Sequence, residues 1–358
     1  MNNNTLIFIL PFFSCLTSFL LTPFVKNLGI KSGCIDYPNS RKQHNVPLVR
    51  IGGISIFIGA IIPIITSLYF IDYLEFQINK IYIFLIVSSL IFTLGFIEDS
   101  KGVSPKKRLL IQFLATSIAW LFGLKIEIEP IFLNWGFEIN NSLSSFLSLI
   151  ISCFFTVGTT NAMNWLDGLD GLASQISLVI LSSLLALSLS FGNQGEIVIL
   201  CITMIGAIIA FLYQNQYPSK IHMGDCGSNF IGFTLASISI FLSKNILILE
   251  SEKTILQAYA PFFLLSIPLI DMFLVIISRI FKKTSPFKPD RSHLHFRMLA
   301  LGFSYTKTVN LITLICASVS LIIFYILNFN IILLIKIFAI ILIFKIFLSR
   351  RLIEKIFY

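Results

Sequence analysis

Long apolar segments recur along this chain and leave few folds open to it. About eleven windows, each of roughly the 17–25 apolar residues that cross a bilayer, lie at about 5–25, 49–71, 80–97, 109–124, 143–163, 172–191, 197–213, 229–247, 258–280, 308–328 and 330–349. The chain has 358 residues, of which 56% are hydrophobic and 12% charged, whereas a globular chain has about 25% charged residues. A soluble protein of this composition has too few polar residues to cover its surface. The sequence therefore predicts an all-α polytopic membrane protein with about eleven transmembrane helices, formed by one domain over residues 1–358.

Lysine and arginine are concentrated in the loops on one side of this predicted bundle. Basic loops follow the first, third, ninth and last windows, whereas the opposite side has Lys80, Lys125, Lys244 and Lys253. Basic loops remain in the cytoplasm, which puts the N-terminus outside and the C-terminus inside. The run from Leu6 to Val25 has no basic residue before it and no cleavage site after it, so we expect a retained first helix.

The distribution of charge argues against nucleic-acid binding, and the spacing of the cysteines argues against a site built on paired cysteines. The charge of +9 follows the loops, and no basic face with interleaved aromatic residues is visible, so nucleic acid is not an expected partner. The six cysteines are scattered without a CxxC pair and are expected to pack as small apolar side chains. Residues 125–140 alternate polar and apolar positions, which predicts a small external hairpin with solvated glutamates.

Five predicted cytoplasmic loops contain all four histidines and most of the acidic residues outside the external segments. They are DYPNSRKQHNVPLVRIGG (36–53), GFIEDSKGVSPKKR (95–108), NAMNWLDGLDGLA (161–173), NQYPSKIHMGDCGSN (215–229) and PFKPDRSHLHFRMLALGFS (286–304). Polar residues at membrane depth are costly and usually mark a site. Five such loops on one face predict a single polar active site.

The residue types in these loops indicate phosphate chemistry with a hard metal ion. Asp99, Asp225 and Asn164 offer oxygen ligands that suit Mg²⁺ rather than zinc. Basic residues that would then meet phosphate are Arg41, Lys42, Arg108, Arg291 and Arg297. A metal between carboxylates and a diphosphate, with basic clamps, is typical of phosphoryl transfer.

Single motifs also have structural interpretations. Asp167 and Asp170 in DGLDG are equally compatible with two turn or N-cap residues, and Glu98 with Asp99 could be interfacial acids at a helix end. Asp271 lies in the ninth window, where a polar contact between helices, for example with Arg279, is the favoured role. The combination of five loops, rather than any single one, favours an active site.

Four segments resemble one enzyme family, the polyprenyl-phosphate N-acetylhexosamine-1-phosphate transferases. They are GFIED with its basic stretch, NAMNWLDGLDGLA, YQNQYPSKIHMGDCGSNFIG and PFKPDRSHLHFRML, and the resemblance runs from about residue 36 to about 304. It implies ten or eleven spans in the bacterial inner membrane and a cytoplasmic, Mg²⁺-dependent site, where Mn²⁺ is an alternative. The implied reaction transfers a sugar 1-phosphate from a UDP-N-acetylhexosamine to undecaprenyl phosphate and releases UMP.

Residue roles follow from the positions that match the family motifs. The resemblance implies that Asp225 and Asn164 hold Mg²⁺, that Asp170 with Gly168 and Leu169 binds the uracil, and that Asp167 lies beside the nucleotide. Asp99 would accept or orient the lipid phosphate's proton, Arg108 would hold phosphate, and Asn215 would lie near the reaction centre. The RSHLHFR loop, with Arg291, His293, His295 and Arg297, would touch the sugar and diphosphate, as would Lys42 as a basic residue of the same face.

Two departures from the family pattern bear on the substrate. The acidic pair is Glu98–Asp99 rather than Asp-Asp, and the family's HxHH loop ends here in Phe296. RSHLHFR resembles the branch that uses UDP-N-acetylglucosamine for O-antigen, enterobacterial antigen or teichoic-acid linkage units, rather than the translocase branch of peptidoglycan synthesis. Another UDP-N-acetyl sugar, such as a 6-deoxyhexosamine or MurNAc-pentapeptide, is the alternative substrate.

Three further questions stay open from the sequence. A secondary transporter with cytoplasmic-side carboxylates is the rival class, although it predicts mid-membrane acids and inverted repeats, and no repeat is visible. The sequence does not distinguish direct transfer from a covalent enzyme intermediate. A homodimer is compatible with the pattern.

Overall fold

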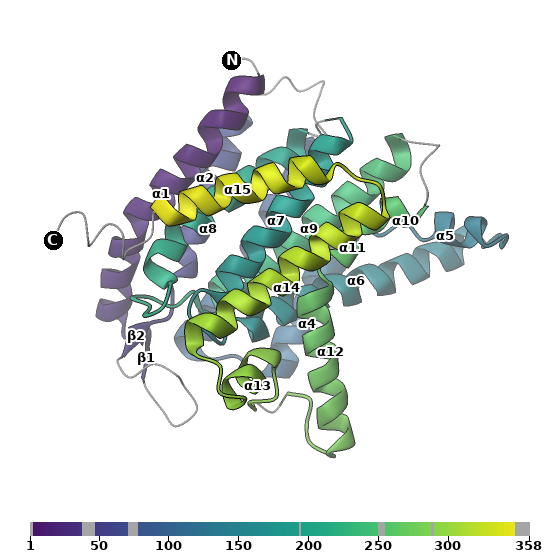
Figure 1. The fold of residues 1–358 in the computed structure, drawn as a ribbon. Coiled ribbons are helices and arrows are strands. Elements are labelled where there is room, and N and C mark those ends of the chain that lie inside the picture. Colours follow the sequence, from purple (N-terminus) through teal and green to yellow (C-terminus); the bar gives the residue numbers. More distant parts are fainter. Residues whose placement is uncertain are drawn as a thin grey trace.

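Helices make up nearly all of the described chain (Figure 1). The computed structural model describes residues 3–37, 47–70, 78–192, 195–249, 255–287 and 290–347. In chain order the elements in these ranges are α1 (Asn3–Ser32), β1 (Ile35–Asp36), β2 (Leu48–Val49), α2 (Gly53–Ser67), α3 (Ile78–Lys101), α4 (Pro105–Leu121), α5 (Glu129–Asn134), α6 (Asn141–Leu166), α7 (Leu172–Ser190), α8 (Gly195–Asn215), α9 (Gly224–Leu249), α10 (Ile255–Ala258), α11 (Ala260–Phe263), α12 (Ser266–Phe281), α13 (Leu294–Ala300), α14 (Tyr305–Ile326) and α15 (Ile331–Phe347). The predicted all-α class is confirmed.

Seven of the described helices are long and apolar enough to cross a membrane, namely α1, α3, α6, α7, α8, α9 and α14. The other predicted windows coincide with α2, α4, α12 and α15, which have 15 to 17 residues. The ninth window is divided among α10, α11 and α12. Pro261 is the second residue of α11 and Pro268 lies in the first turn of α12, and proline lacks the N–H that would continue the hydrogen bonding of a preceding helix. The chain is therefore a multi-pass membrane protein, while the number of spans and their orientation stay predictions.

Helix α8 lies at the centre of the bundle. Of its most apolar window 94% is buried, against 28% for α1, and α1, α2, α7 and α9 pack around it. Small residues allow this close packing: Ser14 Oγ of α1 donates to the carbonyls of Gly59 and Thr203, at 2.8 and 2.5 Å. Lipid is as apolar as the helices, so close approach and hydrogen bonds between helices replace the hydrophobic drive of soluble proteins.

Helices α3, α6 and α9 pack together and bring three polar ends to one place. The C-terminal ends of α3 and α6 meet the N-terminal end of α9. Gly95 permits the contact, because a Cβ there would lie 2.5 Å from the carbonyl oxygen of Asp225. Gly224, just before Asp225, has a φ of 74°, a conformation that favours glycine.

A short antiparallel sheet fixes the next segment of this face. Ile35 pairs with Val49 and Asp36 with Leu48. The carbonyl of Val49 accepts from the backbone N–H of His222 at 2.8 Å, and Gly52 N–H donates back to the His222 carbonyl at 3.0 Å. The segment 48–53 is thereby attached to the loop that precedes α9, which places Arg50 beside the start of that helix.

The external segment after α4 is not the predicted hairpin. Residues 125–128 have no regular structure, and α5 begins at Glu129 with Pro130 in its first turn, a favoured position for proline. Glu127 is paired rather than solvated, with its Oε1 3.6 Å from Lys125 and 3.3 Å from Lys244. The hairpin prediction was wrong because the polar alternation reflected these pairs instead of strand pairing.

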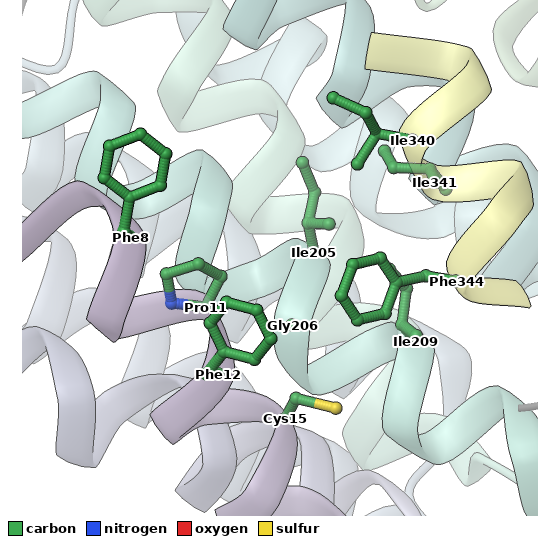
Figure 2. A pocket seen from close by; sticks show the side chains of 10 residues that line it. All are labelled: Phe8, Pro11, Phe12, Cys15, Ile205, Gly206, Ile209, Ile340, Ile341 and Phe344. Carbon is green, nitrogen blue, oxygen red and sulfur yellow. The ribbon is translucent and has the colours of Figure 1, made fainter. Parts of the chain in front are cut away.

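An apolar groove flanks α15, which lies across α7 and α8 in Figure 1. Figure 2 shows its lining, from Phe8 and Phe12 of α1 through Ile205 and Gly206 of α8 to Phe344 of α15, around a cavity of about 300 Å³. Cys15 also lines it, and it is one of six free cysteines, five of them buried. The lining includes no charged side chain, so phosphate chemistry belongs elsewhere.

Candidate active site

Asp99 attaches the end of α3 to the start of α9. Its Oδ1 accepts from the backbone N–H of Asp225 at 3.0 Å, and its Oδ2 accepts from that of Cys226 at 2.9 Å. These are the first N–H groups of α9, where a helix has unpaired donors and a partial positive charge. The Asp99 side chain is fully buried. In this structure Asp99 therefore positions Asp225 and presents no free oxygen to a substrate.

Asp225 is the point at which three segments meet. Its Oδ1 accepts from Asn164 Nδ2 at 2.7 Å, and the same Nδ2 donates to Ser228 Oγ at 2.9 Å. Its Oδ2 lies 3.4 Å from Arg50 Nη2, while Arg50 Nε donates to Asp99 Oδ1 at 3.0 Å. The structure thus brings the two predicted metal ligands, Asp225 and Asn164, into direct contact.

Glu98, the unusual member of the acidic pair, faces a cavity. Its Oε1 accepts from Arg108 Nη1 at 2.8 Å, whereas its Oε2 is buried without a partner in the described part of the chain. Both residues line a pocket of about 350 Å³ together with Pro105, Asn164, Trp165, Arg279, Phe287, Asp290, His293 and Phe296. The two acids therefore have separate surroundings: Asp99 is bound to backbone, and Glu98 is directed to the pocket.

We expect Glu98→Asp to lower the transfer rate about tenfold. The aspartate side chain is one methylene shorter, so the 2.8 Å pair with Arg108 cannot form at the present backbone positions. A misplacement of a functional group by about 1 Å can lower the reaction rate by up to about 100-fold. Initial rates of lipid-linked product formation measure the effect. A variant as fast as the wild type would show that the length of this side chain is immaterial.

The DGLDG loop is bonded to the loop before α9. Asp170 Oδ2 accepts from Ser219 N–H at 3.0 Å, its Oδ1 lies 3.4 Å from His222 Nε2, and its backbone N–H donates to the Tyr305 hydroxyl. Burial raises the pKa of Asp170, but the hydrogen bonds from His222 and Ser219 outweigh it and leave the pKa below its usual value. Tyr305 stacks on Tyr217 at 4.3 Å, which closes this side of the site.

Asn215 connects the same two loops. Its Oδ1 accepts from Gly171 N–H at 3.1 Å and from Ser174 Oγ at 3.2 Å, and its Nδ2 donates to the Ile221 carbonyl at 3.1 Å. The side chain is buried, and all three contacts are within the protein. The structure therefore places Asn215 as a connection beneath the site, not at the pocket surface.

The RSHLHFR segment is held by two buried charges of α12. Arg279 forms a bidentate pair with Asp290, at 3.1 and 2.9 Å, and Asp271 Oδ2 lies 2.9 Å from His293 Nδ1. The contact predicted between Asp271 and Arg279 is thus replaced by two contacts to the following loop. The sequence suggested the wrong partner, because it does not show that the loop folds back over α12.

His295 lies beneath the DGLDG loop. Its ring is fully buried, and neither ring nitrogen has a hydrogen-bond partner in the described part of the chain. A Cβ on Gly168 would lie 2.3 Å from His295 Nε2, so the loop can pass here only with glycine. Burial and the neighbouring His293 lower the pKa of His295 to about 3, which keeps it neutral at pH 7. Leu169 is also buried.

Several carboxyl groups lie close together here, and each disfavours a negative charge on its neighbours, so a bound cation would relieve their repulsion. Burial, Asp225 and Asp170 raise the pKa of Asp167 well above its usual value. Among the described residues no group of three or more His, Cys, Asp or Glu side chains is arranged to hold a metal on its own. Mg²⁺ commonly takes one or two protein oxygens and completes its shell with substrate phosphates and water. The donors Asp225 and Asn164 fit such an ion bound together with a nucleotide.

The remaining predicted residues have less defined positions. Lys42, like Arg41, lies outside the described residues. Arg291 is exposed, and Arg297, half-exposed, has its Nη2 3.9 Å from Asp271 Oδ1. Sequence reasoning gave no role to Arg50, Trp165 or His222. Arg50 stood among the basic residues of its loop, and no pattern in the chain indicated that it would bridge Asp99 and Asp225.

Comparison with known proteins places this site in a family. Residues 81–243 match the model of glycosyl transferase family 4. A probable undecaprenyl-phosphate N-acetylglucosaminyl 1-phosphate transferase of Bacillus subtilis is 34% identical over 303 residues, 84% of this chain and 80% of the relative. Undecaprenyl-phosphate alpha-N-acetylglucosaminyl 1-phosphate transferase of Escherichia coli K12 is 30% identical over 303 residues, 82% of this chain and 77% of the relative. A decaprenyl-phosphate N-acetylglucosaminephosphotransferase of Mycobacterium tuberculosis is 27% identical over 325 residues, 84% of this chain and 78% of the relative.

Fold, site and relatives together define a multi-pass membrane transferase. The chain belongs to glycosyl transferase family 4, among the polyprenyl-phosphate N-acetylglucosaminyl 1-phosphate transferases. The family predicted from the sequence motifs is confirmed, and the transporter interpretation is not favoured.

Proposed function

We propose that this protein transfers N-acetylglucosamine 1-phosphate from UDP-N-acetylglucosamine to undecaprenyl phosphate, giving undecaprenyl-diphosphate N-acetylglucosamine and UMP. The observation that carries the proposal is the contact of Asp225 with Asn164 beside a pocket lined by Glu98 and Arg108. The named relatives in B. subtilis and E. coli support the same donor and acceptor. We further propose that the site faces the cytoplasm of the bacterial inner membrane, because the basic loops lie on that side.

The proposed cofactor is Mg²⁺, with Mn²⁺ as a substitute. Asp225 and Asn164 would hold it, and when bound it would neutralise charge on the donor's diphosphate. Arg50, paired with Asp99 and Asp225, keeps the two carboxylates close together at the start of α9. Arg108 would add a second cation on the pocket side, where its Nε has no partner in the described part of the chain.

The chemical step requires the lipid phosphate to attack the phosphorus that carries the sugar. A new P–O bond forms to the lipid phosphate, and the bond between that phosphorus and the UMP oxygen breaks. The geometry favours Glu98 as acceptor of any proton on the lipid phosphate, because its Oε2 is unpaired while the oxygens of Asp99 are bound to backbone N–H groups. A direct transfer of this kind needs no covalent enzyme intermediate.

Different groups of residues lie on the two sides of Asp225, and they suggest where the uracil and the sugar diphosphate of the UDP-sugar bind. The uracil would lie on the side of Asp170, Gly168 and Leu169, with Asp167 beside the nucleotide. The sugar diphosphate would lie in the pocket on the side of Arg108 and His293. Arg291 and Arg297 are exposed around the same loop and would meet the donor as it enters.

The test is a transfer assay on the purified protein in detergent. With labelled UDP-N-acetylglucosamine, undecaprenyl phosphate and Mg²⁺, label should become extractable with lipid, and UMP should appear in equal amount. Prior treatment with EDTA should abolish turnover, and added Mg²⁺ should restore it. The same assay with UDP-MurNAc-pentapeptide and with a UDP-N-acetyl-6-deoxyhexosamine ranks the donors.

Several outcomes would contradict the proposal. Absence of transfer with UDP-N-acetylglucosamine, or a faster reaction with another UDP-sugar, would refute the assigned donor. Full activity after EDTA would refute the metal. Uptake of the nucleotide sugar into sealed proteoliposomes without any lipid-linked product would favour the transporter class.

A further inference from the structure

The buried carboxylate of Asp271 has no part in the chemistry described so far. It lies in α12 with 5% of its surface exposed, and a buried charge is costly unless it is paired. Its Oδ2 lies 2.9 Å from His293 Nδ1, and its Oδ1 accepts from the backbone N–H of Leu294 at 2.8 Å. Asp271 therefore fixes both the ring of His293 and the start of α13.

His293 is held on three sides. Besides the Asp271 contact, the edge of its ring meets Trp165 at 5.4 Å, and the ring stacks on His295 at 5.7 Å. His293 lines the 350 Å³ pocket, and its Nε2 makes no hydrogen bond within the ranges that the structure describes. Because Nδ1 is occupied, Nε2 is the ring nitrogen left for a ligand.

The two arginines that line the pocket, Arg279 and Arg108, differ in how many of their nitrogens are already hydrogen-bonded within the protein. Arg279 uses Nε and Nη2 for Asp290 and Nη1 for the Pro286 carbonyl, and its guanidinium lies 5.0 Å from the Trp165 ring. Arg279 therefore uses its Nε, Nη1 and Nη2 to hold the loop. Among the described residues, Arg108, through its Nε, and His293, through its Nε2, remain as the pocket groups with a nitrogen left for a ligand.

We propose that Asp271 is a positioning residue of the transfer reaction: it holds His293 by Nδ1 so that the ring nitrogen Nε2 faces the sugar diphosphate of the donor. The inference rests on the proposed function and adds to it a residue outside the matched motifs. A side chain fixed before the substrate arrives costs no reorganisation when the reaction occurs.

The test is Asp271→Asn, measured with His293→Ala and with the double variant. Asparagine has nearly the same volume, and its single oxygen can still accept from Leu294 N–H, but its amide nitrogen cannot accept a hydrogen bond from His293 Nδ1 as the Asp271 carboxylate oxygen can. We expect kcat/KM for UDP-N-acetylglucosamine to fall about 30-fold, a loss comparable to the roughly 10–100-fold seen when a hydrogen-bond partner of a metal-bound histidine is removed. Inhibition by UMP, which lacks the sugar and its phosphate, should change less than about twofold, since the nucleotide side is untouched.

The double variant separates positioning from structural support. If Asp271 acts through His293, the double variant should be no slower than His293→Ala alone, because coupled residues are not additive. The inference would be overturned if the losses in kcat/KM of the two single variants multiplied in the double variant. Weaker inhibition of Asp271→Asn than of the wild type by UMP would also overturn it. Glu196→Gln is the matched control: this carboxylate is 4% exposed and lies 3.4 Å from Lys80 Nζ, among residues of α3, α8 and α9. It should lower the melting temperature without changing kcat/KM.

A second variant keeps the test decisive if Asp271→Asn folds poorly. Asp271→Glu keeps the charge, and we expect it to retain at least ten times the kcat/KM of His293→Ala. A folded Asp271→Glu protein as slow as His293→Ala would contradict the inference. An inactive wild type would refute the proposed function itself, whereas an active wild type with an unchanged Asp271→Asn would refute the role of Asp271 alone.

Discussion

Replacing Asp225 with asparagine should reduce transfer by about 1000-fold or more, a loss of about 4 kcal/mol of transition-state stabilisation. Asp225 is the carboxylate that contacts Asn164 at 2.7 Å and Arg50 at 3.4 Å, and the proposed Mg²⁺ needs its charge. The amide is equal in size, and its single oxygen can still accept from Asn164, so only the long 3.4 Å contact to Arg50 is lost. The melting temperature in detergent should therefore change little, while initial rates fall.

Metal binding provides an independent measurement for the same variant. In the wild type, Mg²⁺ with UDP-N-acetylglucosamine should raise the melting temperature, because a ligand that binds the folded state stabilises it. Asp225→Asn should lose this rise. Glu127→Gln, on the external segment near Lys125 and Lys244, is the control and should keep both activity and rise. Turnover of Asp225→Asn near the wild-type rate would remove Asp225 from the metal site.

Arg50→Gln should affect both stability and activity. Arg50 is a cation partner of Asp99, whose side chain is fully buried, and it lies between Asp99 and Asp225. Removing one partner of a buried pair costs about 3–5 kcal/mol; because Arg50 is itself about one third exposed, we expect about 2 kcal/mol. Transfer should fall about 100-fold, because the two carboxylates then repel each other across the start of α9.

Thermal unfolding in detergent and initial rates measure the two effects of Arg50→Gln. Lys307→Gln removes an exposed positive charge near the start of α14 and should leave both quantities unchanged. Higher stability in Arg50→Gln than in the wild type would show that Asp99 needs no cation. Full activity would show that Arg50 only fills space between the two acids.

The sequence predicted the membrane class and the family because both can be read from the order of residues along the chain, without knowledge of tertiary contacts. Apolar windows depend on bilayer thickness alone, and DGLDG and MGDCGS keep their order along the chain. It also predicted that Asp225 and Asn164 would act together, and the structure shows them in contact. Their role as metal ligands stays a proposal.

What the sequence could not supply were partners far apart in the chain. Asp99 and Glu98 are neighbours in sequence, yet successive helical side chains point in different directions, so one reaches α9 and the other the pocket. Arg50 depends on the pairing of β1 with β2 and on the backbone contact to His222. Arg279 was the example of a partner suggested for Asp271, because nothing in the sequence showed that the loop returns to α12.

The attachments of the RSHLHFR segment have a consequence for how members of this family diverge. Asp290 and His293 are both tied to α12, through Arg279 and Asp271, whereas the acidic centre is tied to α3, α6 and α9. Residues 266–287 and 290–300 thus form a unit whose surface, proposed to face the sugar, can change while the reaction centre keeps its geometry. An exchange of donor preference between relatives would have to transplant the helix together with its loop, since the loop grafted alone would lose both of its anchors.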